Sequence, residues 1–75
     1  MKEFVEYIVK AIVNDPDAVV VTEIPDEDGI TLKLEVAEED KGRVIGKQGR
    51  VVQAMRTLLR VMAIRQGTRV QLDII

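Results

Sequence analysis

Apolar positions recur at helical spacing in two segments of this chain. The first segment predicts an amphipathic helix over roughly residues 2–14, because apolar residues fall three or four positions apart there: Phe4, Val5, Ile8, Val9, Ile12 and Val13. The second predicts a longer helix over about residues 50–66, with an apolar stripe formed by Val51, Val52, Met55, Leu58, Leu59 and Met62. Gly67 suits the end of this longer helix, because glycine readily adopts the left-handed conformation found there.

Three other segments have the composition or the alternation of strands. Residues 18–24 are rich in β-branched side chains, which predicts a short strand with both faces partly covered. Residues 30–36 alternate between apolar and polar side chains, as do residues 70–74, and both segments predict half-buried strands. The turn sequence Pro25-Asp26-Glu27-Asp28-Gly29 separates the first two strands and predicts a hairpin.

A further short helix is expected over about residues 38–45. Its predicted start is acidic, and acidic side chains stabilise the first turn of a helix. The element order is therefore helix, strand, strand, helix, helix, strand. Seventy-five residues leave room for one domain only, spanning residues 1–75. We expect an α+β fold in which the helices cover one face of a three-stranded sheet.

The composition argues against catalysis and against a membrane protein. The chain contains no His, Cys or Ser, so the usual general bases and nucleophiles are missing and we expect no enzyme activity. No metal ligand set, disulfide or cofactor is predicted. No apolar run approaches the roughly 20 residues that span a bilayer, and the first residues lack the apolar core of a signal peptide. We therefore expect a cytoplasmic protein without membrane contact.

The formal net charge of −2 hides a strong asymmetry along the chain. Residues 1–40 carry three basic and twelve acidic side chains, whereas residues 41–75 carry eight basic side chains and one acidic side chain. Local potential governs the encounter with a polyanion, so the basic half is a candidate surface for nucleic acid. The alternative is that the two halves simply pair with each other on the folded surface.

The sequence Gly46-Lys47-Gln48-Gly49, which we call the glycine loop, lies between the short and the long predicted helix. A nucleotide-binding P-loop is disfavoured, because three residues separate Gly42 from Gly46 where that motif needs four, and Gln48 stands where Ser or Thr must bind magnesium. A structural turn would need the glycines but not the cations beside them. A phosphate clamp would use both, since unpaired N–H groups and the positive end of the helix dipole lie at the start of the following helix.

Residues 45–52 resemble the signature of the KH domain. That signature is an aliphatic residue, Gly, two variable residues, Gly, two more residues and an aliphatic residue, and this chain has Ile45 and Val52 at its two ends. The element order is similar to that of the type II KH fold, and the resemblance covers essentially the whole chain. The chain most resembles the small bacterial RNA-binding proteins that consist of a single KH domain.

This resemblance implies non-catalytic binding of single-stranded RNA, with about four nucleotides lying in an aliphatic groove beside the glycine loop. Gly46 and Gly49 would give RNA access to the backbone, Lys47 and Gln48 would face phosphates, and Arg50 would add charge. Ile45 and Val52 would form an apolar floor for the bases, or would instead be ordinary core residues. A role as an RNA chaperone or post-transcriptional regulator is implied as well.

Two groups of side chains on the flanking helices have two interpretations each. Arg43, Arg56 and Arg60 either extend a basic track along the RNA or belong to solvated helix faces, and the second is favoured for Arg56 and Arg60. Val61 and Ile64 lie on the predicted polar side of the long helix, where they either contact a partner or are isolated apolar residues. The alternative function is a protein–protein adaptor with little RNA binding. The resemblance implies a second KH-containing RNA-binding protein as partner, with self-association as a further option.

Overall fold

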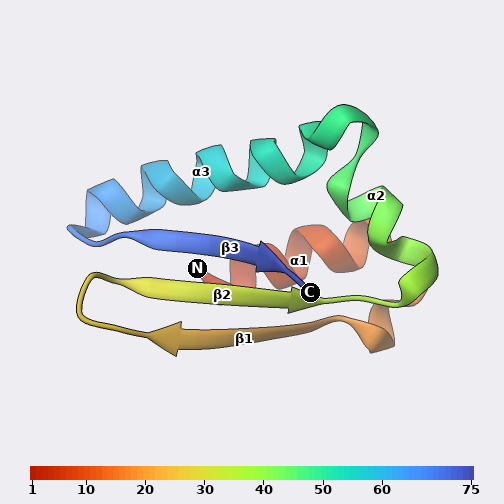
Figure 1. The fold of residues 1–75 in the computed structure, drawn as a ribbon, viewed down its shortest axis with the longest axis horizontal. Coiled ribbons are helices and arrows are strands. Elements are labelled where there is room, and N and C mark those ends of the chain that lie inside the picture. The colour runs from red at the N-terminus through yellow and green to blue at the C-terminus, as the bar shows by residue number, and fades with distance from the viewer.

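The computed structural model describes residues 1–75 and has the predicted element order (Figure 1). Its helices and strands are α1 (Lys2–Ile12), β1 (Val20–Pro25), β2 (Ile30–Glu35), α2 (Lys41–Ile45), α3 (Arg50–Gln66) and β3 (Val70–Ile74). Short 3₁₀ turns at Pro16–Ala18, Glu38–Asp40 and Lys47–Gly49 join them. The prediction of an α+β domain is confirmed.

The sheet is mixed and has the order β1-β2-β3. Strand β1 pairs antiparallel with β2, which confirms the hairpin, whereas β3 pairs parallel with β2 and places Leu72 opposite Leu32. A parallel partner requires a long crossover, and α2 and α3 supply it. Because β3 is the last strand of the sheet, one of its edges has no neighbouring strand and lies beside α3 (Figure 1).

The core lies between one face of the sheet and the helices. Helix α1 buries Val5 and Val9. Helix α3 buries one stripe, formed by Val52, Met55, Leu59 and Ala63. These side chains pack against the inward-facing residues of the sheet, chiefly Val21, Leu32, Leu34 and Leu72. The opposite face of β2 exposes Lys33 and Glu35, so the sheet is covered on one face only.

Two details of the apolar pattern differ from the prediction. Strand β1 is not covered on both faces, because the helices cover one face of the sheet only: Val21 points inward and is buried, while Val20 and Ile24 point to the open face and are exposed. Leu58 does not belong to the buried stripe of α3 and is 49% exposed. The exposure of Leu58 follows from the helical period, because neighbouring residues of a helix point about 100° apart and Leu59 is the one that points into the core.

The start of α2 is fixed by a buried carboxylate. Asp40 is fully buried, and its two oxygens accept hydrogen bonds from the backbone N–H groups of Asn14 and Asp15 at 3.0 and 3.1 Å. These bonds tie the segment after α1 to the helix that leads into the glycine loop. They also account for the first helix ending at Ile12 and not near residue 14, because the N–H groups of residues 14 and 15 bind Asp40 instead of α1 carbonyls.

Candidate nucleic-acid interface

The glycine loop has a backbone conformation that few sequences can adopt. Three of its four residues have a positive φ: Gly46 at 80°, Gln48 at 58° and Gly49 at 75°. The turn is closed by hydrogen bonds, because the Gly46 N–H donates to the Gly42 carbonyl at 2.8 Å and the Gly49 N–H donates to the Gly46 carbonyl at 3.1 Å. The loop therefore has a defined shape before any ligand binds.

The two glycines are needed for different reasons. Gly46 combines φ 80° with ψ 170°, a region that only glycine occupies readily. A Cβ atom at this position would also lie 2.4 Å from Cγ2 and 2.8 Å from the backbone nitrogen of Val51. Gly49 has an ordinary left-handed conformation, and a Cβ atom there would meet nothing within 4 Å. Position 46 thus requires glycine for space and conformation, and position 49 for conformation alone.

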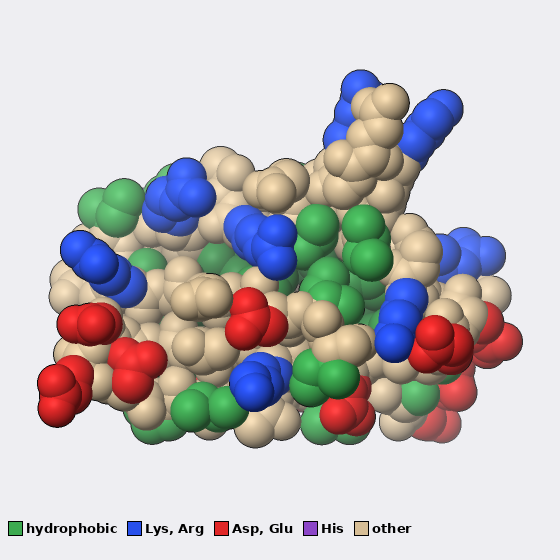
Figure 2. Space-filling model, viewed as in Figure 1, with side chains coloured by type: hydrophobic (Ala, Val, Ile, Leu, Met, Phe, Trp, Pro, Cys, Tyr) green, Lys and Arg blue, Asp and Glu red, His purple; other side chains and the backbone are tan.

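Cationic side chains surround this bare backbone. Lys47 and Arg50 are exposed, and neither forms an ion pair with a carboxylate. The Arg50 guanidinium donates a hydrogen bond to the Gln48 side-chain oxygen at 3.2 Å, which orients both groups on the outside of the loop. Figure 2 shows basic side chains projecting from the molecule where Figure 1 places the junction of α2 and α3. The first turn of α3 adds N–H groups and the positive end of a 17-residue helix dipole.

Apolar surface lies next to the loop. Ile45, the last residue of α2, is 40% exposed, whereas Val52 is only 6% exposed and belongs to the core. Figure 2 shows hydrophobic side chains gathered below the projecting basic groups, between the glycine loop and β3. Of the two residues predicted to form an apolar floor, Ile45 offers surface to a ligand and Val52 offers very little.

Arg56 occupies a position that sequence patterns did not predict. Its Nε and Nη2 atoms donate to the backbone carbonyl of Leu72 at 3.2 and 2.9 Å, so the guanidinium binds the free edge of β3. The interpretation of Arg56 as part of a solvated helix face is therefore wrong. Arg43 also has a partner, because its Nε lies 3.7 Å from the Asp40 carboxylate. Arg60 is exposed and forms no ion pair.

Two clefts follow the edge of β3 alongside α3. The cleft nearer the glycine loop, the proximal cleft, has a volume of about 160 Å³ and is lined by Arg56, Leu59, Arg60, Val70, Gln71 and Leu72. The distal cleft has a volume of about 330 Å³ and is lined by Arg60, Ala63, Ile64, Thr68, Arg69 and Val70. The sequence patterns did not single out Arg69, and its place in a three-residue turn between α3 and β3 is the one signal that marks it.

The predicted partner residues are both on the surface. Val61 is 51% exposed and Ile64 is 69% exposed, and the exposed Leu58 enlarges the apolar area on α3. Ile64 also lines the distal cleft, whereas Val61 does not. No cluster of metal-ligating side chains is present, and none of the helices is long and apolar enough to cross a bilayer.

A family model described as the KH domain of KhpA/KhpB matches residues 2–74. The chain belongs to this family. It is 51% identical over 75 residues to "RNA-binding protein KhpA" of Caldanaerobacter subterraneus subsp. tengcongensis, and 47% identical over 75 residues to the protein of the same name from Clostridium acetobutylicum, with both chains fully covered in each case. A third relative with this name, from Chlamydia pneumoniae, is 45% identical over 74 residues, which cover 99% of this chain and 95% of the relative. No solved structure matches the chain.

Membership settles two of the predictions made from the sequence. The resemblance to small bacterial single-KH proteins is confirmed, because the match covers nearly every residue and the relatives have the same length. The family is one of KH-domain proteins and not of enzymes, in agreement with a chain that contains no His, Cys or Ser.

Proposed function

We propose that this protein binds single-stranded RNA without catalysis, in the cytoplasm, and that the glycine loop holds the phosphate backbone. The observation that carries the proposal is the conformation of the loop, which exposes backbone between two unpaired cations at the start of α3. The relatives that carry the name RNA-binding protein support the choice of RNA as ligand.

In this proposal each part of the loop has its own task. The start of α3 faces a phosphate, because it is the positive end of the helix dipole, although the Arg50 N–H itself already donates to the Lys47 carbonyl. Lys47 and Arg50 add charge on either side, and Gln48 donates or accepts hydrogen bonds beside them. Gly46 and Gly49 keep the backbone free of side chains, so a phosphate can approach closely.

The bases would lie on the apolar surface next to the loop, with Ile45 as its main exposed residue and Val52 supporting it from the core. The chain has no Trp, and its single Phe and single Tyr lie on α1, so aromatic stacking contributes nothing beside the loop. We therefore expect affinity in about the micromolar range and a salt slope of about −2 to −3, from roughly 0.7 per phosphate over three or four contacts. Weak and largely sequence-independent binding of this kind suits an RNA chaperone or post-transcriptional regulator.

The decisive experiment is a charge reversal in the loop, Lys47→Asp with Gln48→Asp. Asp tolerates the left-handed conformation of position 48, so the fold should survive. We expect loss of binding to a short single-stranded RNA, measured by amide NMR titration, with little change in melting temperature. The matched control is Arg65→Asp with Gln66→Asp, which makes the same change in net charge at the other end of α3. Unchanged affinity in the folded loop variant would refute the phosphate clamp.

A second surface supports a protein partner in addition to RNA. Leu58, Val61 and Ile64 expose apolar side chains on α3, and an exposed apolar area of this kind is typical of association sites. We propose that Leu58 and Val61 contact a second KH-containing RNA-binding protein or another copy of this chain, and that Ile64, which also lines the distal cleft, lies at the border of this contact. If association dominated and RNA bound only weakly, the protein would instead be an adaptor with a KH fold.

Val61→Asp tests this surface, because Val61 lines neither of the clefts beside β3. We expect a lower mass by sedimentation equilibrium, or weaker capture of the KH partner, while RNA binding of the monomer stays within about twofold. Lys10→Asp on α1 is the control for an added acidic side chain away from the surface. An unchanged association state would exclude Val61 as a contact residue.

A further inference from the structure

The distal cleft lies on the side of the proximal cleft that is farther from the glycine loop. Arg60 and Val70 line both clefts, so the two clefts are neighbours along α3 and the edge of β3. Ile64, in the distal cleft, follows Gly49 by fifteen residues, or about 22 Å along the helix axis. At about 330 Å³, the distal cleft falls within the range of small-ligand pockets, which begins near 300 Å³.

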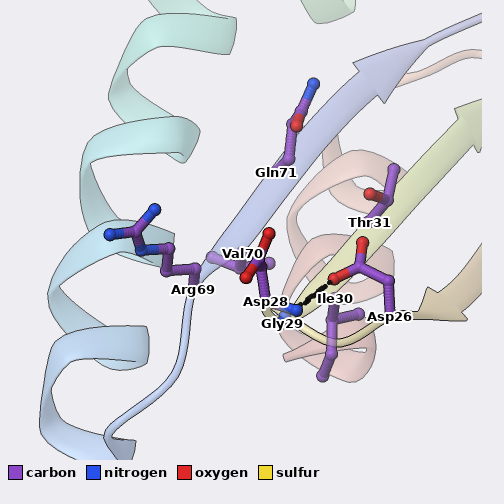
Figure 3. Close-up of a pocket in the computed structure, with 8 residues that line it drawn as sticks. All are labelled: Asp26, Asp28, Gly29, Ile30, Thr31, Arg69, Val70 and Gln71. Carbon is purple, nitrogen blue, oxygen red and sulfur yellow. Dashed lines mark hydrogen bonds between the residues drawn. The ribbon is translucent and has the colours of Figure 1, made fainter.

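The charges of the distal cleft favour an anion. Its two charged lining residues are Arg60 and Arg69, and no acidic side chain lines it. Neither arginine forms an ion pair anywhere in the structure. Figure 3 shows Arg69 at the start of β3 with its guanidinium directed toward α3, the helix that carries Arg60. Both guanidinium groups are exposed and have donors available for a phosphate, which arginine binds through two parallel N–H bonds.

The apolar part of the cleft fits a base. Ile64 is largely exposed, and Ala63 and Val70 lie with it in the lining. An aliphatic surface flanked by two cations matches a nucleotide, which has an apolar face on its base and a charge on its phosphate. A protein partner of matching shape would leave the two arginines unpaired unless it supplied acidic groups.

We propose that the distal cleft is an extension subsite for a further nucleotide of the same RNA strand that the glycine loop holds. Arg60 and Arg69 bind its phosphate, and its base lies against Ile64. The subsite rests on the proposed function, because it requires a strand already anchored at the loop. It lengthens the RNA footprint beyond the four nucleotides beside the loop.

An acidic turn lies just beyond the distal cleft and sets the end of this path. A neighbouring cavity of about 360 Å³ is lined by Arg69 together with Asp26 and Asp28 of the hairpin turn. The Asp26 carboxylate accepts hydrogen bonds from the N–H groups of Asp28 and Gly29 at 2.8 and 2.9 Å, which holds it in the turn (Figure 3). The carboxylates of Asp26 and Asp28 repel a phosphate that enters this cavity, so nucleotides beyond Arg69 should add no affinity.

The test compares RNAs of four, six and eight nucleotides of one base composition. Binding is measured for the wild type, for Arg60→Gln with Arg69→Gln, and for a control with the same charge change, Lys10→Gln with Arg65→Gln. The control residues are exposed and line neither cleft. A longer strand offers extra registers, and a longer site can use fewer of them, so each measured gain is corrected for the number of registers that the site in question allows.

We expect the wild type to gain about three- to tenfold more than the Arg60/Arg69 variant between four and six nucleotides, as exposed charge contacts typically contribute. The control should keep the gain, and eight nucleotides should bind no tighter than six after the statistical correction. The salt slope of the wild type should steepen by about 0.7 on lengthening, and that of the variant should not.

Each other outcome contradicts either the proposed function or the extension subsite. If the wild type does not bind the tetranucleotide, the proposed function itself fails. If the tetranucleotide binds but the variant gains as much as the wild type on lengthening, the extension subsite is wrong. An equal loss in the control would show a non-specific charge effect, and a loss confined to the tetranucleotide would place the arginines in the primary site instead.

Discussion

Replacement of Gly46 and Gly49 by alanine should have very different costs, although both glycines belong to the same loop. At position 46 the backbone lies in a region that costs other residues about 3 kcal/mol. The new Cβ would also overlap Val51, including its backbone nitrogen at 2.8 Å, so a change of rotamer cannot relieve the contact, and overpacking costs about 1–3 kcal/mol. We therefore expect Gly46→Ala to lower the free energy of unfolding by about 4 kcal/mol or more.

At position 49 only the conformational penalty applies, because a Cβ there meets nothing within 4 Å. Gly49→Ala should cost about 1–2 kcal/mol. Gly42 is the internal control, since it lies inside α2 with a negative φ and open space around its missing Cβ. Gly42→Ala should leave stability unchanged or raise it by about 0.4–1 kcal/mol, because alanine restricts the unfolded chain.

Urea unfolding followed by circular dichroism measures all three variants, as the chain has no Trp to report by fluorescence. A 75-residue domain has a total stability of about 4–11 kcal/mol, so Gly46→Ala removes a large part of it and unfolds the chain outright at the lower end of that range. Equal destabilisation by Gly46→Ala and Gly49→Ala would refute the argument that position 46 lacks space for a side chain.

Two further predictions concern residues that hold the interface in place. Asp40→Ala should lower the free energy of unfolding by about 2–4 kcal/mol, because it leaves the N–H groups of Asn14 and Asp15 without their acceptor. Asp40→Asn should cost less, since one acceptor oxygen remains. Urea unfolding of the two variants shows whether the alanine variant is the less stable one. Arg56→Met should lower the free energy of unfolding by about 1–2 kcal/mol through loss of its hydrogen bonds to the Leu72 carbonyl, whereas Arg60→Met should change it by no more than about 0.5 kcal/mol. Equal destabilisation of the two variants in thermal unfolding would contradict a structural role for Arg56 at the edge of β3.

Local signals were enough to predict the elements that depend on nearby residues. The spacing of Gly46 and Gly49 located the loop, and the period of Met55 and Leu59 located α3 with its correct ends. The alternation in residues 30–36 located β2. In these cases the residues that determine the structure are neighbours in the chain, so their order carries the information.

The remaining features depend on contacts between distant segments. Asp40 follows two solvated glutamates and resembles them, but the segment after α1 supplies its two N–H donors, Asn14 and Asp15. Arg56 binds a carbonyl sixteen residues away, and no periodicity encodes the position of α3 relative to β3. By sequence, Leu58 fits the apolar stripe of the helix as well as Leu59 does. Which of the two is buried depends on the side of α3 that packs against the sheet. Val52 belongs to the KH signature by sequence and to the core by packing.

The free edge of β3 has a consequence for how the protein behaves at high concentration. An unpaired strand edge is a template on which a strand from another molecule can form hydrogen bonds, and such pairing leads to fibrils. The Leu72 carbonyl is in the middle of this edge, and the Arg56 guanidinium already occupies it with two hydrogen bonds. A side chain from a helix therefore fills the acceptor that an incoming strand would need, and it adds a positive charge that repels a second copy of the same edge.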